Sequence, residues 1–114
     1  MKIKISKASL VSLVGKILNI VEKRNAMPVL VNVLLEATKD RLKIFSTNLE
    51  VSLTDEVKCE TLTPGKVAVS AKNLFDIIKE MPEGDLTLER QDNNWLKINL
   101  DKSVFNIVGI SPEE

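Results

Sequence analysis

The stretch that decides the fold is RNAMPVLVNVLLEA, residues Arg24–Ala37. It joins a basic segment to Pro28 and then to a run of aliphatic and β-branched residues. Pro28 cannot continue a helix, so helical spacing upstream must end before it. Val29–Ala37 has the composition of a buried strand. The sequence therefore predicts a helix, a loop and then a strand at this point.

Upstream of this stretch, residues 7–21 carry apolar side chains at helical spacing. These form one broad face, at Leu10, Leu13, Val14, Ile17, Leu18 and Val21. Ser6 is a suitable N-cap. We expect the helix to end between Glu22 and Asn25, which places Arg24 in the following loop. Before the helix, Ile3 and Ile5 alternate with lysines, as in a short strand.

Downstream, the pattern predicts further strands and a second helix. Strands are expected at 42–46, 50–57 and 67–69, with a loop at 61–65 that contains Pro64. A helix over 71–81 is expected to start at a Ser70 cap and to end at Pro82-Glu83-Gly84. Three alternating runs follow, at 86–88, 96–100 and 104–110.

This order predicts an α+β fold, with two helices packed on two antiparallel β-sheets. Each half of the chain has the order strand, helix and three strands, which indicates an internal pseudo-duplication. The 114 residues suffice for one domain, and no linker or low-complexity segment divides them. We therefore expect residues 1–114 to form a single domain.

Composition narrows the class of protein. Apolar residues make up 44% and charged residues 28% of the chain, an ordinary soluble composition. No apolar run approaches the ~20 residues that a membrane helix needs, and the N-terminus lacks the apolar core of a signal peptide. Cys59 is the only cysteine, so no internal disulfide can form. We expect a cytoplasmic protein that has no membrane partner.

Catalytic chemistry has little support. The chain has no histidine, which excludes Ser-His-Asp and Cys-His arrangements and four-ligand Cys/His zinc sites. Its 4 glycines are far apart, so no phosphate-binding loop exists. Asp55 could be paired with Glu50, and Asp85 with Glu89, but both pairs alternate with apolar residues and are expected to face solvent. We expect neither an enzyme nor a bound metal or cofactor.

The polar sides of both predicted helices are basic, although the net charge is zero. In the first helix, one stripe without acidic residues contains Ser9, Ser12, Lys16, Asn19 and Lys23, with Lys7 beside its start. In the second helix, the outward positions are Lys72, Asn73, Asp76 and Lys79. Such faces are typical of solvated helices, but lysine, serine and asparagine also bind phosphates without reading bases.

Three segments in this order, residues 24–37, 47–53 and 65–84, closely resemble the first domain of the bacterial sliding clamp, the DNA polymerase III beta subunit. The resemblance implies a non-enzymatic processivity factor that encircles duplex DNA, binds its backbone without sequence preference and tethers the replicative polymerase. It also implies that this domain is the first of three. Arg24 and Lys72 match DNA-contact positions of the family, and Lys7, Lys16, Lys23 and Lys79 are weaker candidates.

The same resemblance implies protein partners. The final run, Ser103–Val108, matches a strand that pairs with a second clamp subunit in a homodimeric ring, with Phe105 and Ile107 at apolar interface positions. Both residues could equally belong to this domain's own core. DNA polymerase III and the clamp loader would bind through domains absent here. The alternative is a free-standing intracellular α+β protein-interaction module that does not bind DNA.

Overall fold

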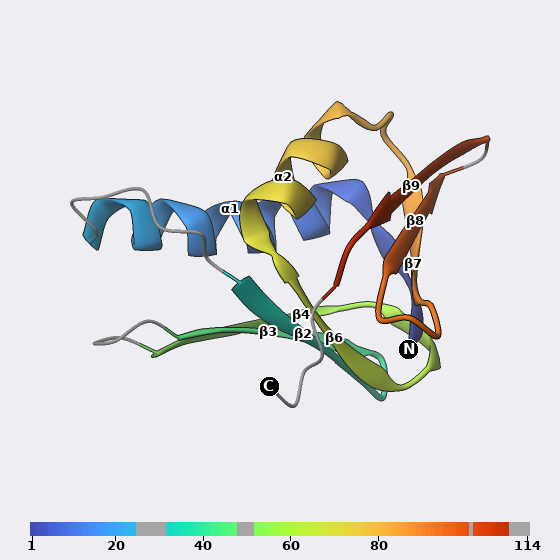
Figure 1. Ribbon diagram of the computed structural model, residues 1–114, viewed down its shortest axis with the longest axis horizontal. Coiled ribbons are helices and arrows are strands. Elements are labelled where there is room, and N and C mark those ends of the chain that lie inside the picture. The colour runs from blue at the N-terminus through green and yellow to red at the C-terminus, as the bar shows by residue number, and fades with distance from the viewer. Residues whose placement is uncertain (25–31, 48–51, 101, 110–114) are drawn as a thin grey trace.

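A computed structural model describes residues 1–24, 32–47, 52–100 and 102–109, with side chains described in these ranges except at 21–24, 47, 52 and 53. Its elements are β1 (Lys2–Ser6), α1 (Lys7–Arg24), β2 (Asn32–Thr38), β3 (Arg41–Thr47), β4 (Ser52–Lys58), β5 (Glu60–Thr63), β6 (Gly65–Ser70), α2 (Ala71–Glu80), β7 (Asp85–Arg90), β8 (Leu96–Leu100) and β9 (Ser103–Ile107). Figure 1 shows the two helices together above the sheet that contains β2, β3, β4 and β6, with β7, β8 and β9 standing beside them.

The strands form two antiparallel sheets that exchange strands between the two halves of the chain. One sheet has the order β5-β1-β7-β8-β9, and the other has the order β4-β3-β2-β6. β1 and β6 each precede a helix, and each pairs with the first strand that follows the other helix. The predicted α+β class and the two helices on two antiparallel sheets are therefore confirmed. The predicted order of strand, helix and three strands holds in the second half, but in the described part of the first half four strands, β2 to β5, lie between α1 and β6.

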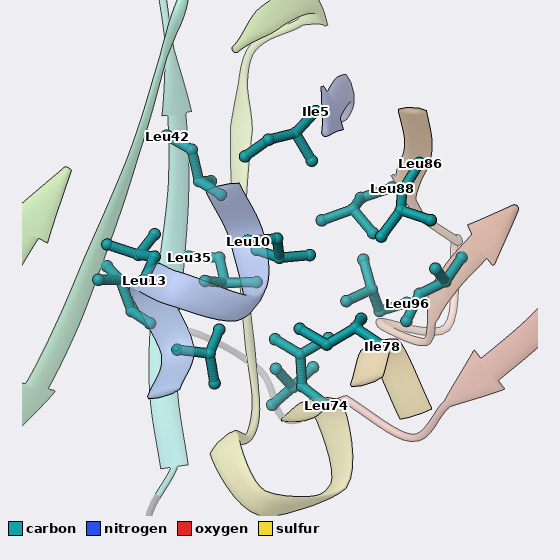
Figure 2. Packing of buried hydrophobic residues seen from close by; sticks show 14 of the residues in the cluster. Ile5, Leu10, Leu13, Leu35, Leu42, Leu74, Ile78, Leu86, Leu88 and Leu96 are labelled. Carbon is teal, nitrogen blue, oxygen red and sulfur yellow. The ribbon is translucent and has the colours of Figure 1, made fainter. Parts of the chain in front are cut away.

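The core lies between the helices and the inner faces of both sheets (Figure 2). Strand register aligns apolar residues into rows that cross each sheet. One row runs Ile3, Leu88, Ile98 and Phe105, and the other runs Val67, Leu35, Ile44 and Asp55. The first three members of each row are 0% exposed. Each row ends on an edge strand, β9 or β4, because no further strand follows there in the part of the chain that the structure describes.

Two sequence predictions are wrong in detail. Residues 61–65 were expected to form a loop, but Glu60–Thr63 is the strand β5, paired with β1 at the sheet edge. It is short and mostly exposed, so it lacks the apolar alternation that marks a half-buried strand. Arg24 was expected in a loop, but it is the last residue of α1. The expected strand residues 29–31, 50–51 and 110 lie outside the described part of the chain.

Candidate nucleic-acid interface

The first half of the candidate interface is the polar side of α1. Its apolar side is buried in the core, which leaves Ser12, Lys16 and Asn19 exposed on the opposite side. Ser9, which also belongs to the predicted stripe, is only partly exposed, and its hydroxyl accepts a hydrogen bond from the hydroxyl of Ser6 at 2.9 Å. Lys23 and Arg24 lie on the last turn of the same helix, and their side chains lie outside the described residues.

The second half is the outward side of α2. Ser70 caps this helix as predicted, because its hydroxyl accepts a hydrogen bond from the backbone N–H of Asn73 at 3.3 Å. Leu74 and Ile78 are buried, whereas Lys72 and Lys79 are exposed. The cap therefore fixes the start of a short amphipathic helix that presents two ammonium groups to solvent.

The two polar sides meet in a groove. α1 and α2 pack closely at Gly15, where an added Cβ atom would lie 3.3 Å from Cε1 of Phe75. A groove of about 340 Å³ lies along this contact, and its lining includes Gly15, Leu18, Asn19, Lys72, Phe75, Asp76 and Lys79. The fold thus brings Asn19 from one helix beside Lys72 and Lys79 from the other, although they are distant in sequence.

Carboxylates hold two of the exposed lysines. Lys16 Nζ lies 3.4 Å from Asp55 Oδ2, and Lys79 Nζ lies 3.5 Å from Asp76 Oδ1. Lys79 also lies 5.7 Å from the ring centroid of Phe75, within cation–π range. Within the described ranges, Lys72 makes no ion pair. It is therefore the exposed lysine of the groove that is most available to a phosphate.

The family model described as "DNA polymerase III beta subunit, N-terminal domain" matches residues 1–114. The chain belongs to this family. The beta sliding clamp of Caulobacter vibrioides is 35% identical over 109 residues, which cover 94% of this chain and 29% of that protein. The beta-subunit domain thus spans about three-tenths of the length of such relatives.

Solved structures also match the beta-subunit domain. The structure named Caulobacter crescentus pol III beta superimposes with a TM-score of 0.86 at 33% identity, covering 100% of this chain and 31% of that one. The DNA polymerase III subunit beta from Pseudomonas aeruginosa gives 0.86 at 28% identity, with the same two coverages. The fold and the recognised family therefore agree over the whole chain.

Lys7 of the beta-subunit domain lies in a different setting from the other candidate lysines. Its side chain is only 14% exposed, and its Nζ donates a hydrogen bond of 2.6 Å to the carbonyl oxygen of Met81, beyond the end of α2. Glu83 lies 3.7 Å from the same nitrogen. The backbone N–H of Lys7 also donates a hydrogen bond to the carbonyl oxygen of Gly84. Lys7 therefore joins the start of α1 to the loop between α2 and β7.

The two predicted subunit-interface residues of the beta-subunit domain differ in burial. Phe105 is 41% exposed, while Ile107 is 5% exposed and belongs to the core. Both face inward along β9, but Phe105 ends the core row of its sheet at the edge strand. Val104 and Val108 are also exposed beside it. Phe105 thus continues the core row of its sheet, but no described strand lies on its outer side.

Sequence reasoning missed Asp55. It was expected to face solvent, but the register places it opposite Ile44 on the inner face of its sheet, where it reaches Lys16. The alternation Leu53-Asp55-Val57 carries the signal, because it sets an acid among inward-facing positions. Its partner lies 39 positions away, so sequence spacing alone could not identify the pair.

Other chemistry has little support in the described part of the domain. Groups of three or more His, Cys, Asp or Glu that could hold a metal ion are absent from these residues. Burial raises the pKa of the Cys59 thiol, and nearby Asp40 raises it further, although a hydrogen bond with Thr61 opposes this. The thiol is therefore neutral and weakly nucleophilic near pH 7. Within the described ranges, no helix is long and apolar enough to cross a membrane.

Proposed function

We propose that this chain is the first of three domains of a DNA sliding clamp, a processivity factor that encircles duplex DNA and tethers the replicative polymerase. Membership of the beta-subunit family supports this, as do the names of its relatives. The function requires no reaction, metal or cofactor. Polymerase III and the clamp loader would bind through domains beyond this chain, and the working compartment would be the cytoplasm.

The observation that carries the proposal is the groove between α1 and α2. Asn19, Lys72 and Lys79 line it on a side of the domain where Lys16 and Ser12 are also exposed. Ammonium, hydroxyl and amide groups bind phosphate oxygens in any sequence context. Lys72 offers a full positive charge without the planar, two-pronged geometry of an arginine. A lysine contact suits movement along the backbone.

Binding by one isolated domain should be weak. Non-specific DNA binders have dissociation constants of ~10⁻⁴ to 10⁻⁶ M at physiological salt. A single domain with few free ammonium groups should fall at or beyond the weak end of that range. In the full assembly, enclosure by a ring rather than affinity would keep the protein on DNA.

The ring would close through β9 and a second subunit. Among the described residues, no strand pairs with β9 on its outer side, and Phe105 ends a buried row there. A strand added to this edge would bury Phe105 and continue the row. Ile107, already buried, would support the strand from within the domain.

This part of the proposal is tested with Phe105→Asp in the full-length subunit. The substitution removes apolar area that is partly buried, so it should lower the Tm of the isolated 114-residue domain but leave it folded, with one cooperative unfolding transition. The same substitution should shift the full-length protein from dimer to monomer in analytical ultracentrifugation. An unchanged dimer, or an unfolded isolated domain, would count against the assignment.

The DNA-facing side is tested by Lys72→Gln with Lys39→Gln as its control. Both changes remove one exposed lysine, but Lys39 lies in the turn between β2 and β3 and is not among the groove residues. Binding of a short duplex at low salt should weaken for Lys72→Gln and change little for Lys39→Gln. If both variants weakened duplex binding equally, the loss would be a general effect of charge. That result would favour the alternative, an α+β protein-interaction module without DNA binding.

A further inference from the structure

Two of the candidate DNA-facing lysines, Lys16 and Lys79, are paired with carboxylates from two separate parts of the fold. Lys16 on α1 is paired with Asp55 on the edge strand β4, and Lys79 is paired with Asp76 one turn earlier on α2. Each of these carboxylates lies within 4 Å of its lysine ammonium group, at 3.4 Å for Lys16 and 3.5 Å for Lys79. Asp76 also lines the inter-helix groove, together with Lys79.

The position of Asp55 is unusual within its sheet. It is the last member of the row Val67, Leu35 and Ile44, all of which are 0% exposed. The corresponding end of the other sheet's row is the apolar residue Phe105. An acid therefore stands at an inward-facing edge position, and its Oδ2 atom is directed to Lys16 while its Oδ1 atom accepts the N–H of Glu56 at 2.8 Å.

We propose that Asp55 and Asp76 limit the affinity of this surface for the DNA backbone by competing with phosphates for Lys16 and Lys79. The inference rests on the proposed function, since it concerns the same surface. A clamp that moves along DNA needs contacts that form and break easily. These carboxylates would keep each lysine contact weak without removing the lysine.

The exposure of the pairs suits reversible competition. The side chains of Lys16 and Asp55 are 64% and 36% exposed, and those of Lys79 and Asp76 are both 46% exposed. Ion pairs as open as these contribute little to stability, so a phosphate oxygen can displace the carboxylate. The pair re-forms when the phosphate moves away. Lys72, which has no ion pair in the described part of the chain, would supply the more persistent contact.

Asp55→Asn and Asp76→Asn test this inference, because asparagine keeps the shape of the side chain and removes its charge. At position 55, the amide oxygen can still accept the N–H of Glu56. Glu83→Gln is the matched control: it removes the same charge from a lysine pair, but its partner Lys7 is 14% exposed and is held by the carbonyl of Met81.

The measurement is the dissociation constant of a short duplex for wild type and the three variants, over a series of salt concentrations. Asp55→Asn and Asp76→Asn should each tighten binding by about two- to five-fold, the upper value corresponding to ~1 kcal/mol. Each freed lysine should also steepen the slope of log K against log salt by up to ~0.9. Glu83→Gln should show only a small, general increase.

The outcomes separate this inference from the proposed function. If wild type binds duplex DNA but the two asparagine variants match Glu83→Gln, the carboxylates do not restrain the lysines, although the DNA-facing surface stands. If neither wild type nor any variant binds at low salt, both ideas fail. If Asp55 serves only to prevent strand pairing at the β4 edge, Asp55→Asn will promote self-association without tightening DNA binding, which would also overturn the inference.

Discussion

Replacing Lys7 with methionine should destabilise the domain, because the ammonium group of Lys7 joins the start of α1 to the loop between α2 and β7. Methionine retains most of the unbranched apolar stem and removes the ammonium group. The change deletes the 2.6 Å hydrogen bond to the carbonyl of Met81 and leaves that oxygen without its partner. It also deletes the pair with Glu83, whose side chain is 82% exposed.

The magnitude follows from these two contacts. A hydrogen bond from a charged donor is worth ~1.5–3 kcal/mol, and a pair with so exposed a carboxylate adds little. We therefore expect the free energy of unfolding to fall by about 1.5–3 kcal/mol. For a domain of this size, that corresponds to a decrease in Tm of roughly 5–15 °C.

Urea unfolding followed by circular dichroism measures this change, with thermal unfolding as a second assay. Glu83→Gln is the control and should cost less than ~1 kcal/mol, since it leaves the hydrogen bond to Met81 in place. A Lys7→Met variant as stable as wild type would refute the structural position of Lys7. If that variant also lost as much duplex binding as Lys72→Gln, Lys7 would be a DNA-contact residue and not a structural one.

Three further changes test other features. Ser70→Ala removes the cap of α2 and should lower the free energy of unfolding in urea by ~1 kcal/mol, whereas Ser70→Asp should retain most of the stability. Equal stability of wild type and both variants would show that the Ser70 hydroxyl does not cap the helix. Gly109→Ala would push a Cβ atom against the carbonyl oxygen of Asn94 and should cost ~1–3 kcal/mol, while Val108→Ala beside it, at a 60% exposed position, should cost much less. Because the pKa of Cys59 is higher in the folded than in the unfolded protein, stability should fall as pH rises through the ordinary thiol range, and Cys59→Ala should remove that fall; an unchanged pH profile would show that the thiol is not buried as described.

Local patterns were sufficient to predict most of the elements. The spacing of Leu10, Leu13 and Ile17 identifies α1, and the Ser70 cap with Leu74 and Ile78 identifies α2, because each signal lies within one element. β5 escaped prediction for the opposite reason. It is held by pairing with β1, which is distant in sequence, and not by an apolar alternation of its own.

The candidate site was predictable only in part. Its lysines could be identified from the helical stripes, because the inward positions of both helices are apolar. Their environments could not be, since Lys16 meets Asp55 across 39 positions and Lys7 meets Met81 across 74. Phe105 and Ile107 share one face of β9, yet only the neighbouring strands decide that the first is exposed and the second buried.

The central claim is that the surface formed by α1 and α2 faces duplex DNA. An amide NMR titration of the domain with a short duplex at low salt tests it most directly. The account predicts shifts that cluster at Lys16, Asn19, Lys72 and Lys79, saturate weakly and reverse when salt is added. Shifts scattered over the outer faces of the sheets, or none at millimolar DNA, would contradict the claim and leave the DNA-facing surface without support.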